Sequence, residues 1–232
     1  MPDFMGHHTM RLIELCKFAE NKYNRLLTML ILIFLSEPFI GATIVGVSIV
    51  FIIFFGISLW TILLVIRALE RSRTIFNYYL GLAGLAFCLQ ILGELDNLSI
   101  SNQKIVMISS QAIFLFFIGM SIFLILEEVF ATSIVTSDTI KGGVCVYLLV
   151  GFFWSILYGM VCSLNPAAFS IPMQASDITY FSFITLTTVG YGDIAPISPF
   201  ARILANLEAI VGIMYPTIFI ARLVGLYSQE KK

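Results

Sequence analysis

The chain contains, toward its carboxyl-terminal end, the heptapeptide Thr187-Thr188-Val189-Gly190-Tyr191-Gly192-Asp193. Gly190 and Gly192 alternate with two bulky residues, Val189 and Tyr191. Because glycine adopts positive φ without steric cost, the two glycines allow successive backbone carbonyls to turn toward one axis. Val189 and Tyr191 cannot adopt such a backbone conformation cheaply, so we expect their side chains to point away from that axis. The heptapeptide therefore predicts a row of backbone oxygen atoms, to which Thr188 adds its carbonyl and its hydroxyl.

The residues before the heptapeptide predict a helix that is too short to cross a membrane. Ser176 and Asp177 are suited to begin a helix, because their side-chain oxygens can accept hydrogen bonds from first-turn N–H groups. We predict a polar connection over Asn165–Ala175 and a helix over Ser176–Thr187, whose apolar part is only about 14 Å long. A half-length helix followed by glycine-rich backbone indicates a re-entrant loop, which membranes tolerate only inside protein or beside water.

The composition of the whole chain indicates an integral membrane protein. Of its 232 residues, 59% are hydrophobic and only 12% are charged, whereas a soluble domain has about a quarter charged residues. Apolar runs of roughly 20 residues match the thickness of the hydrocarbon core. We therefore predict an all-α, multi-pass protein with six transmembrane helices, over Leu26–Leu35, Val45–Ile66, Ile75–Leu92, Ile105–Leu126, Val144–Leu164 and Ile203–Leu226.

The lysines and arginines predict the orientation of these helices. If the amino terminus is cytoplasmic, only Lys104 and Arg202 lie outside. The basic residues inside are then Arg11, Lys17, Lys22, Arg25, Arg67, Arg71, Arg73, Lys141, Arg222, Lys231 and Lys232. This asymmetry follows the positive-inside rule, so both termini are expected to be cytoplasmic.

The segment Gly143–Tyr227, with its heptapeptide between two apolar spans, resembles the pore module of potassium channels. The resemblance implies an outer helix, a pore helix, a selectivity filter and an inner helix. It further implies that Thr188, Val189, Gly190, Tyr191 and Gly192 form the filter, that four identical chains surround K⁺ as the permeant ion, and that no cofactor is needed. Val135–Arg222 also looks like small bacterial channel-domain proteins with extra amino-terminal spans, which implies the bacterial inner membrane.

Three regions are expected on this basis. Residues 1–25 form a cytoplasmic amphipathic segment, residues 26–132 a four-helix transmembrane region, and residues 133–232 the pore domain. The predicted fourth span, Ile105–Leu126, contains no charged residue, and a voltage sensor requires arginines repeated within a span. We therefore expect no arginine-rich voltage sensor. The amphipathic stretch Met10–Tyr23 is instead a candidate to lie on the inner leaflet and couple to the pore.

Several residues near the heptapeptide are predicted to support it. The short helix ends near Thr187, so its negative dipole end favours a cation below the filter. In many potassium channel pores a tryptophan on the pore helix bonds the aspartate after the filter, and some pores add a glutamate. Phe181 and Ile184 stand at the matching positions and cannot do so, which leaves Tyr180 or water as the partner of Asp193.

Three residues of the last span are further candidates. Glu208 is a costly charge within an apolar run, and burial there favours its neutral, protonated form at neutral pH. We expect it to brace the filter through a hydrogen bond behind the pore helix, for example to Thr185, rather than to contact the ion directly. Gly212 stands where pore modules often carry a gating hinge, and Pro216 favours a kink. Close helix packing is an equally good explanation for Gly212.

Other functions are less well supported. An enzyme is disfavoured because no nucleophile with a base, metal-ligand cluster or phosphate-binding loop is present, and neither a nucleic acid nor a small-molecule substrate is expected. A nonselective cation channel shares the predicted architecture, but such relatives typically alter the position of Tyr191 or the following glycine. An accessory subunit of a heteromeric channel is a second alternative, although nothing in the heptapeptide is damaged. A potassium uptake transporter is a third, but such proteins usually carry four degenerate repeats in one chain, and the filter sequence is not repeated here.

Overall fold

The computed structural model describes residues 23–35, 56, 73–93 and 100–230. This part of the chain is all-helical, as predicted. Its helices are Tyr23–Leu35, α3 (Arg73–Gly93), α4 (Ile100–Ala131), α5 (Ser137–Leu164), α6 (Ala175–Leu186) and α7 (Pro199–Glu230). The predicted span Val45–Ile66 lies outside the described residues except for position 56, and the predicted amphipathic stretch Met10–Tyr23 lies outside them except for Tyr23.

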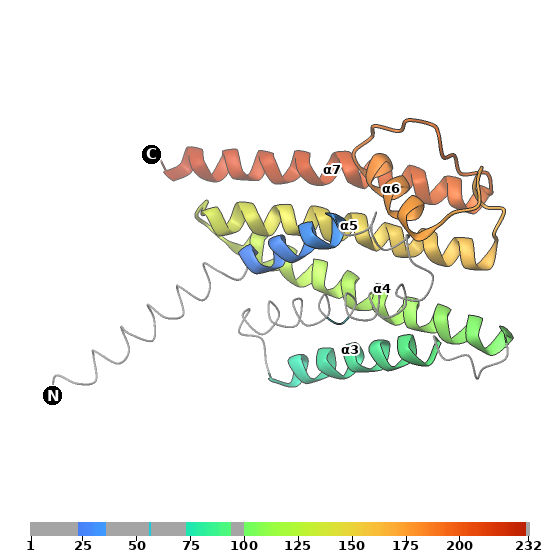
Figure 1. The fold of residues 1–232 in the computed structure, drawn as a ribbon. Coiled ribbons are helices and arrows are strands. Elements are labelled where there is room, and N and C mark those ends of the chain that lie inside the picture. Colours follow the sequence, from blue (N-terminus) through green and yellow to red (C-terminus); the bar gives the residue numbers. More distant parts are fainter. Residues whose placement is uncertain (1–22, 36–55, 57–72, 94–99, 231–232) are drawn as a thin grey trace.

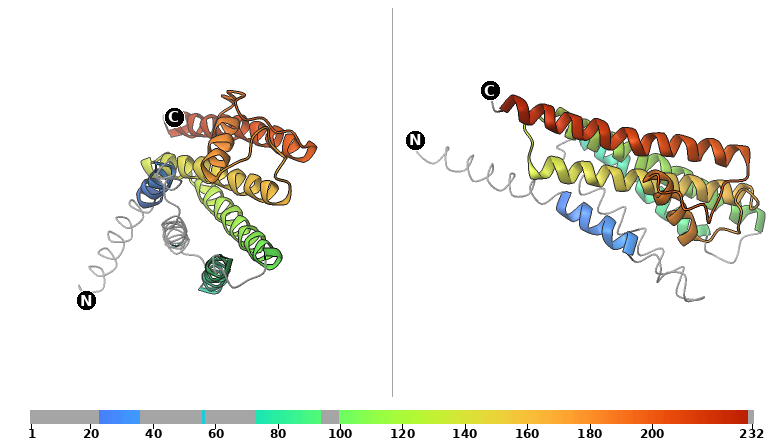
Figure 2. Two further views of the ribbon diagram at one scale, coloured as in Figure 1. Left: turned by 45° about the vertical axis from the view of Figure 1, so that its right-hand side comes forward. Right: turned by 90° about the horizontal axis from the view of Figure 1, so that it is seen from above.

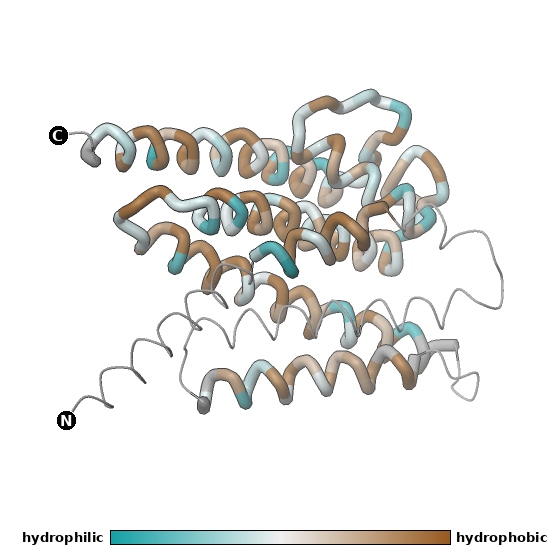
Figure 3. The backbone as a smooth tube through the Cα atoms, turned by 60° about the vertical axis from the view of Figure 1, so that its left-hand side comes forward, coloured by the Kyte–Doolittle hydropathy of each residue, from teal (hydrophilic) through white to brown (hydrophobic). Residues whose placement is uncertain are grey.

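Three of the described helices are long and apolar enough to cross a membrane, over Lys104–Ala131, Ser137–Leu164 and Pro199–Ser228. Figure 3 shows that apolar residues dominate α4, α5 and α7. The apolar runs Tyr23–Leu35 and Phe76–Leu89 are shorter. The chain is therefore an integral membrane protein.

The structured helices extend beyond the apolar runs from which they were predicted, and α5 shows why. The prediction placed its start at Val144, whereas the helix begins at Ser137. The hydroxyl of Thr136 accepts a hydrogen bond from the N–H of Thr139 at 3.1 Å, which satisfies one of the unpaired donors of the first turn. A polar cap thus starts the helix two turns before its apolar run.

Successive helices run in opposite directions, so the start of α3, the α4–α5 connection and the end of α7 lie at one end of the molecule (Figure 1). The segment between α5 and α7, with α6, lies at the opposite end (Figure 1). Helix α3 packs on α4, α4 packs on α5, and α5 and α6 both pack on α7. The left-hand view of Figure 2 shows α3 and α4 on the side of α5 away from α7.

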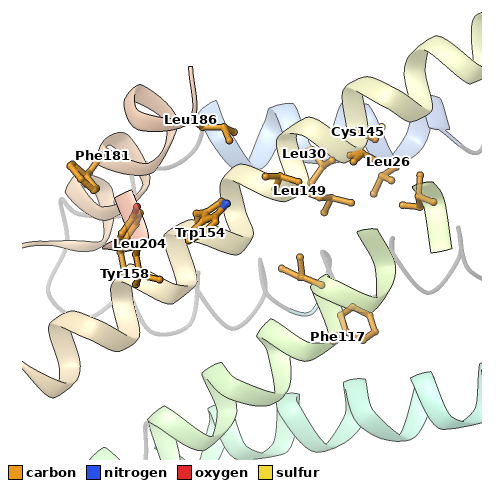
Figure 4. Packing of buried hydrophobic residues seen from close by; sticks show 14 of the residues in the cluster. Leu26, Leu30, Phe117, Cys145, Leu149, Trp154, Tyr158, Phe181, Leu186 and Leu204 are labelled. Carbon is orange, nitrogen blue, oxygen red and sulfur yellow. The ribbon is translucent and has the colours of Figure 1, made fainter. Parts of the chain in front are cut away.

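The core follows α5 along its length. At one end Leu26 of the first helix lies near Cys145 and Leu149, and at the other Tyr158 lies beside Phe181 of α6 (Figure 4). All five side chains are buried.

Two glycines of α5 let neighbouring helices approach closely. A Cβ atom at Gly143 would overlap the ring of Phe219 from α7, and one at Gly151 would overlap the ring of Phe183 from α6. Small residues at helix interfaces are a common device of membrane proteins, because they let side chains of the partner reach the backbone. The glycines therefore help to set where α6 and α7 lie on α5.

Candidate functional site

Helix α6 has only 12 residues, and an acidic side chain caps its amino-terminal end. It begins at Ala175, and the N–H of Gln174 donates to the Asp177 carboxylate at 3.0 Å. Asp177 thus helps to start the helix as predicted, while Ser176 takes no part in this bond. The helix ends at Leu186, and the N–H of Thr187 still donates to the Phe183 carbonyl at 3.0 Å.

Along the backbone after α6, residues with positive φ alternate with residues that lack it. Gly190 has φ of 51° and Gly192 has φ of 80°, so both predicted positive-φ glycines are confirmed. Thr188 also has positive φ, at 60°, which the sequence analysis did not anticipate. Val189 and Tyr191, which lie between these residues, do not have positive φ.

Two hydrogen bonds hold this backbone against the end of α6. The N–H of Thr188 donates to the Thr185 carbonyl at 2.9 Å, and the N–H of Gly190 donates to the Ile184 carbonyl at 3.1 Å. A left-handed conformation costs an L-residue other than glycine about 1–2 kcal/mol. Such strain persists only where the surroundings determine the conformation, and it often marks functional positions.

Residues 187–193 are all exposed in the single chain. The side chain of Val189 is 52% exposed and that of Tyr191 is 72% exposed. The rest of the described chain therefore leaves both side chains beside the strained backbone uncovered.

Asp193 is hydrogen-bonded to Tyr180, one of the two partners that the sequence left open for it. The Tyr180 hydroxyl donates to Asp193 Oδ2 at 2.8 Å. This hydrogen bond raises the pKa of Tyr180 above its ordinary value, so the phenol keeps the proton that it donates. The bond ties the residue that follows the heptapeptide back to α6.

Phe181 and Ile184, the two departures from the potassium channel pattern, have other contacts. The ring of Phe181 packs edge-on against those of Tyr158 and Phe169, with centroids 5.0 and 5.1 Å away. Ile184 is buried and offers its carbonyl to Gly190. Both residues therefore support α6 through packing and backbone contacts rather than through a side-chain hydrogen bond to Asp193.

Glu208 lies behind α6, as expected, but its predicted partner was wrong. The carboxyl group is fully buried. Its Oε1 lies 2.6 Å from Ser182 Oγ, and its Oε2 accepts from the Tyr158 hydroxyl at 2.6 Å. Ser182, one turn before the predicted Thr185, is the α6 hydroxyl that faces both α5 and α7. A tyrosine within an apolar run was the available signal for Tyr158, since buried phenols usually need a partner.

Gly212 of α7 lies against the carboxyl-terminal end of α6. A Cβ atom there would overlap the carbonyl oxygen of Leu186, which also accepts a hydrogen bond from the Tyr147 hydroxyl at 3.3 Å. This contact supports the close-packing interpretation of Gly212. Pro216, four residues later, lies within the continuous helix α7.

A second set of contacts, at the other end of α7, was not anticipated. Arg222 Nη2 donates to the carbonyls of Phe130 and Thr132, the latter at 2.9 Å. Phe130 belongs to the last turn of α4 and Thr132 directly follows its last residue, Ala131. Both carbonyls therefore lie where backbone acceptors lack helical partners. The Tyr215 hydroxyl also donates to the Gly143 carbonyl at 2.8 Å. These side chains connect α7 to both helices of the α4–α5 hairpin.

The helix Tyr23–Leu35 contacts both α4 and α6. The Tyr23 hydroxyl donates to the Glu128 carboxylate of α4. Eleven residues after Tyr23, the ring of Phe34 packs edge-on against that of Phe183 in α6, with centroids 4.9 Å apart. The helix Tyr23–Leu35 therefore links the end of α4 with the side of α6.

Comparison with known proteins agrees with this geometry. Residues 142–229 match a family described as Ion channel, a range that contains α6, the heptapeptide and almost all of α5 and α7. The chain is also 37% identical over 57 residues to the potassium voltage-gated channel protein shk-1 of Caenorhabditis elegans. That match covers 23% of this chain and 11% of the worm protein, so the chain corresponds to a small part of that relative. No solved structure matches the chain.

Proposed function

We propose that the chain conducts K⁺ passively and selectively through a filter formed by Thr188–Gly192. The match of residues 142–229 to a family described as Ion channel, and the similarity of a short stretch to a potassium channel protein, support this proposal. One observation carries the proposal. The sign of φ alternates along the loop: it is positive at Thr188, Gly190 and Gly192 but not at Val189 and Tyr191. This alternation allows successive carbonyls to turn toward one side of the chain.

The chemistry follows from this backbone. A potassium ion that enters a narrow passage must lose its water, and rings of carbonyl dipoles can replace that shell. The Thr188 hydroxyl would supply the innermost ring. The carboxyl-terminal end of α6, at Leu186 and Thr187, carries the negative end of the helix dipole and would favour a cation beneath the filter.

A filter of this kind needs four copies of the loop, so we propose a homotetramer. The exposure of residues 187–193 in the single chain supports it. Helix α7 supports it further, because its apolar side chains are largely uncovered. Those at least half exposed are Phe200, Ile203, Ile210, Ile213, Met214, Ile218, Ile220, Val224 and Tyr227. Lipid, neighbouring chains and the pore interior would share this surface.

Residues 26–132 would form a peripheral helical region without an arginine-rich voltage sensor, and residues 133–232 the pore domain. Helix α4 supports the first part, since its only charged residues are Lys104, Glu127 and Glu128. The end of the molecule with Arg73 and Arg222 would face the cytoplasm by the positive-inside rule, which places both termini inside and the filter toward the outer face of a bacterial inner membrane.

The residues around the filter would act as its supports. Tyr180 would hold Asp193, and Glu208 would hold α6 through Ser182. Thr185 would act through its carbonyl, which accepts from Thr188. Gly212 would serve chiefly as a packing position, while a hinge at Gly212 or Pro216 remains part of the proposal for gating.

A flux assay tests the proposed function. The purified protein is reconstituted in liposomes loaded with K⁺, and uptake or release is followed with K⁺, with Na⁺ in its place, and with Ba²⁺ as a blocker. We expect K⁺ flux that Ba²⁺ blocks and that Na⁺ does not support. Equal Na⁺ flux would identify a nonselective cation channel instead, and absence of flux from a stable tetramer would favour an accessory subunit.

A further inference from the structure

The buried carboxyl group of Glu208 lies in a closed set of oxygen partners from two other helices. Oε2 accepts from the Tyr158 hydroxyl, and Oε1 lies 2.6 Å from Ser182 Oγ. Ser182 Oγ in turn lies 2.8 Å from the Gly151 carbonyl oxygen. The side chains of Tyr158, Ser182 and Glu208 are all fully buried. Every proton in this set can therefore be counted.

If Glu208 is ionised, this set has fewer hydrogen-bond donors than its contacts require. A carboxylate and a backbone carbonyl are acceptors only, and a serine hydroxyl has a single proton. Ser182 would then face two acceptors, Glu208 Oε1 and the Gly151 carbonyl, with one proton for both. Two buried oxygens would be held close together without a full hydrogen bond, and leaving such a group unsatisfied is costly.

One additional proton satisfies every group. With a proton on Oε1, Glu208 donates to Ser182, and Ser182 donates to the Gly151 carbonyl. Tyr158 donates to Oε2 as before. Three donors then meet three acceptors, and no buried charge remains.

The surroundings of Glu208 favour the same assignment. From α5 it faces the phenols of Tyr158 and Tyr147, and from α6 the hydroxyl of Ser182. On α7 itself, Arg202 Nε donates to the Pro196 carbonyl and Arg222 to carbonyls at the end of α4. Within the described residues no lysine, arginine or histidine pairs with Glu208. An unpaired carboxylate within an apolar span would be expensive.

We propose that Glu208 is held as the neutral acid and acts as a proton-dependent positioning residue, which joins the middle of α6 to α5 and α7. This inference rests on the proposed channel function for its effect on conduction. Ser182 is six residues before Thr188, so loss of the proton would weaken the attachment of α6 close to the proposed filter. K⁺ flux should therefore fall as the pH rises.

Infrared spectroscopy tests the protonation directly. In the reconstituted protein at neutral pH we expect the carbonyl-stretching band of a protonated carboxylic acid. Glu208→Gln should remove this band, whereas Glu127→Gln, which changes an exposed carboxyl group on α4, should leave it. A spectrum in which Glu208→Gln removes no such band would overturn the assignment, whatever the flux.

The pH profile of K⁺ flux tests the consequence. Glutamine can donate to Ser182 and accept from Tyr158, so Glu208→Gln should retain flux at neutral pH and lose the decline at alkaline pH. Glu208→Leu, which can do neither, should lose flux. An unchanged pH profile in Glu208→Gln, or a loss of flux at neutral pH as large as in Glu208→Leu, would contradict the positioning role.

Two further results keep the proton assignment and the proposed function distinguishable. If Glu208→Gln does not assemble, Ser182→Ala serves in its place, and it should shift the carboxylic acid band of Glu208 because the acceptor is lost. An unshifted band would contradict the assignment.

Absence of K⁺ flux from the wild-type protein would defeat the proposed function, while the infrared band would still decide whether Glu208 carries a proton.

Discussion

Gly212 of α7 lies so close to Leu186 at the end of α6 that a Cβ atom at Gly212 would overlap the Leu186 carbonyl oxygen. Leu186 is the last residue of α6, directly before the heptapeptide. The backbone of α7 thus supports the point at which the proposed filter begins, and any side chain at position 212 must displace one of the two helices.

Gly212→Ala should therefore destabilise the assembled protein. Overpacking typically costs about 1–3 kcal/mol, and here the obstacle is backbone rather than a flexible side chain. Gly225→Ala is the matched control on the same helix, because a Cβ atom there meets nothing within 4 Å. Thermal stability of the tetramer, measured by size-exclusion chromatography after heating, should fall only for Gly212→Ala. Normal stability with an altered open fraction in single-channel recordings would favour the hinge interpretation instead.

Gly190→Ala should reduce K⁺ flux and selectivity. Gly190 has φ of 51°, and an alanine there would bear about 1–2 kcal/mol of strain in every subunit. We expect the loop to relax and the Na⁺ flux to rise relative to K⁺ in the liposome assay. Gly84→Ala, on an α3 surface with nothing within 4 Å of the new Cβ atom, should leave both fluxes unchanged. Unaltered K⁺ selectivity in Gly190→Ala would argue against a filter at this position.

Tyr180→Phe should shorten the time for which the protein conducts. The change removes the donor to Asp193 and releases the residue that follows the proposed filter. Single-channel or macroscopic current should decline faster during a sustained recording. Asp193→Asn and the double variant complete a thermodynamic cycle, and effects that simply add would show that the two side chains do not act together.

The effect of Tyr180→Phe should also persist across a wide pH range. The hydrogen bond to Asp193 raises the pKa of Tyr180, so its contribution is complete below the ordinary tyrosine pKa of about 10. It is lost only as the pH rises through the higher pKa of the folded protein. If wild type and Tyr180→Phe conducted for equal times at neutral pH, this result would contradict a raised pKa of Tyr180.

Arg222→Gln should loosen the junction between α4 and α7. The guanidinium donates to two carbonyls at the end of α4 and lies over the Phe130 ring, with its central carbon 5.2 Å from the centroid. A cation at a helix carboxyl terminus contributes about 0.3–1 kcal/mol where it is exposed, and more where it is partly buried. We expect a lower unfolding temperature and a changed open fraction. Arg222→Lys, which keeps the charge but not the planar fork, should be intermediate, and equal stability of all three proteins would exclude a structural role for the junction.

The backbone of the heptapeptide was predictable because its determinants are local. Positive φ at Gly190 and Gly192 follows from the absence of a side chain, and the short α6 follows from the length of its apolar run. The left-handed Thr188 could not be predicted in the same way, because a β-branched residue disfavours that conformation. Its N–H bond to Thr185, together with the Gly190 bond to Ile184, holds the conformation at the end of α6.

The sequence by itself determined the membrane class, the helices that contain the predicted spans Ile105–Leu126, Val144–Leu164 and Ile203–Leu226, and the positive φ of Gly190 and Gly192. It could do so because hydrophobic length and glycine's missing side chain act over a few residues. Only the tertiary structure decided which groups meet across helices. Ser182 rather than Thr185 meets Glu208, and Arg222 meets the end of α4. These pairings depend on the rotation and height of each helix, which the contacts at Gly143, Gly151 and Gly212 help to set. Such contacts join residues dozens of positions apart, so no local pattern in the chain specifies them.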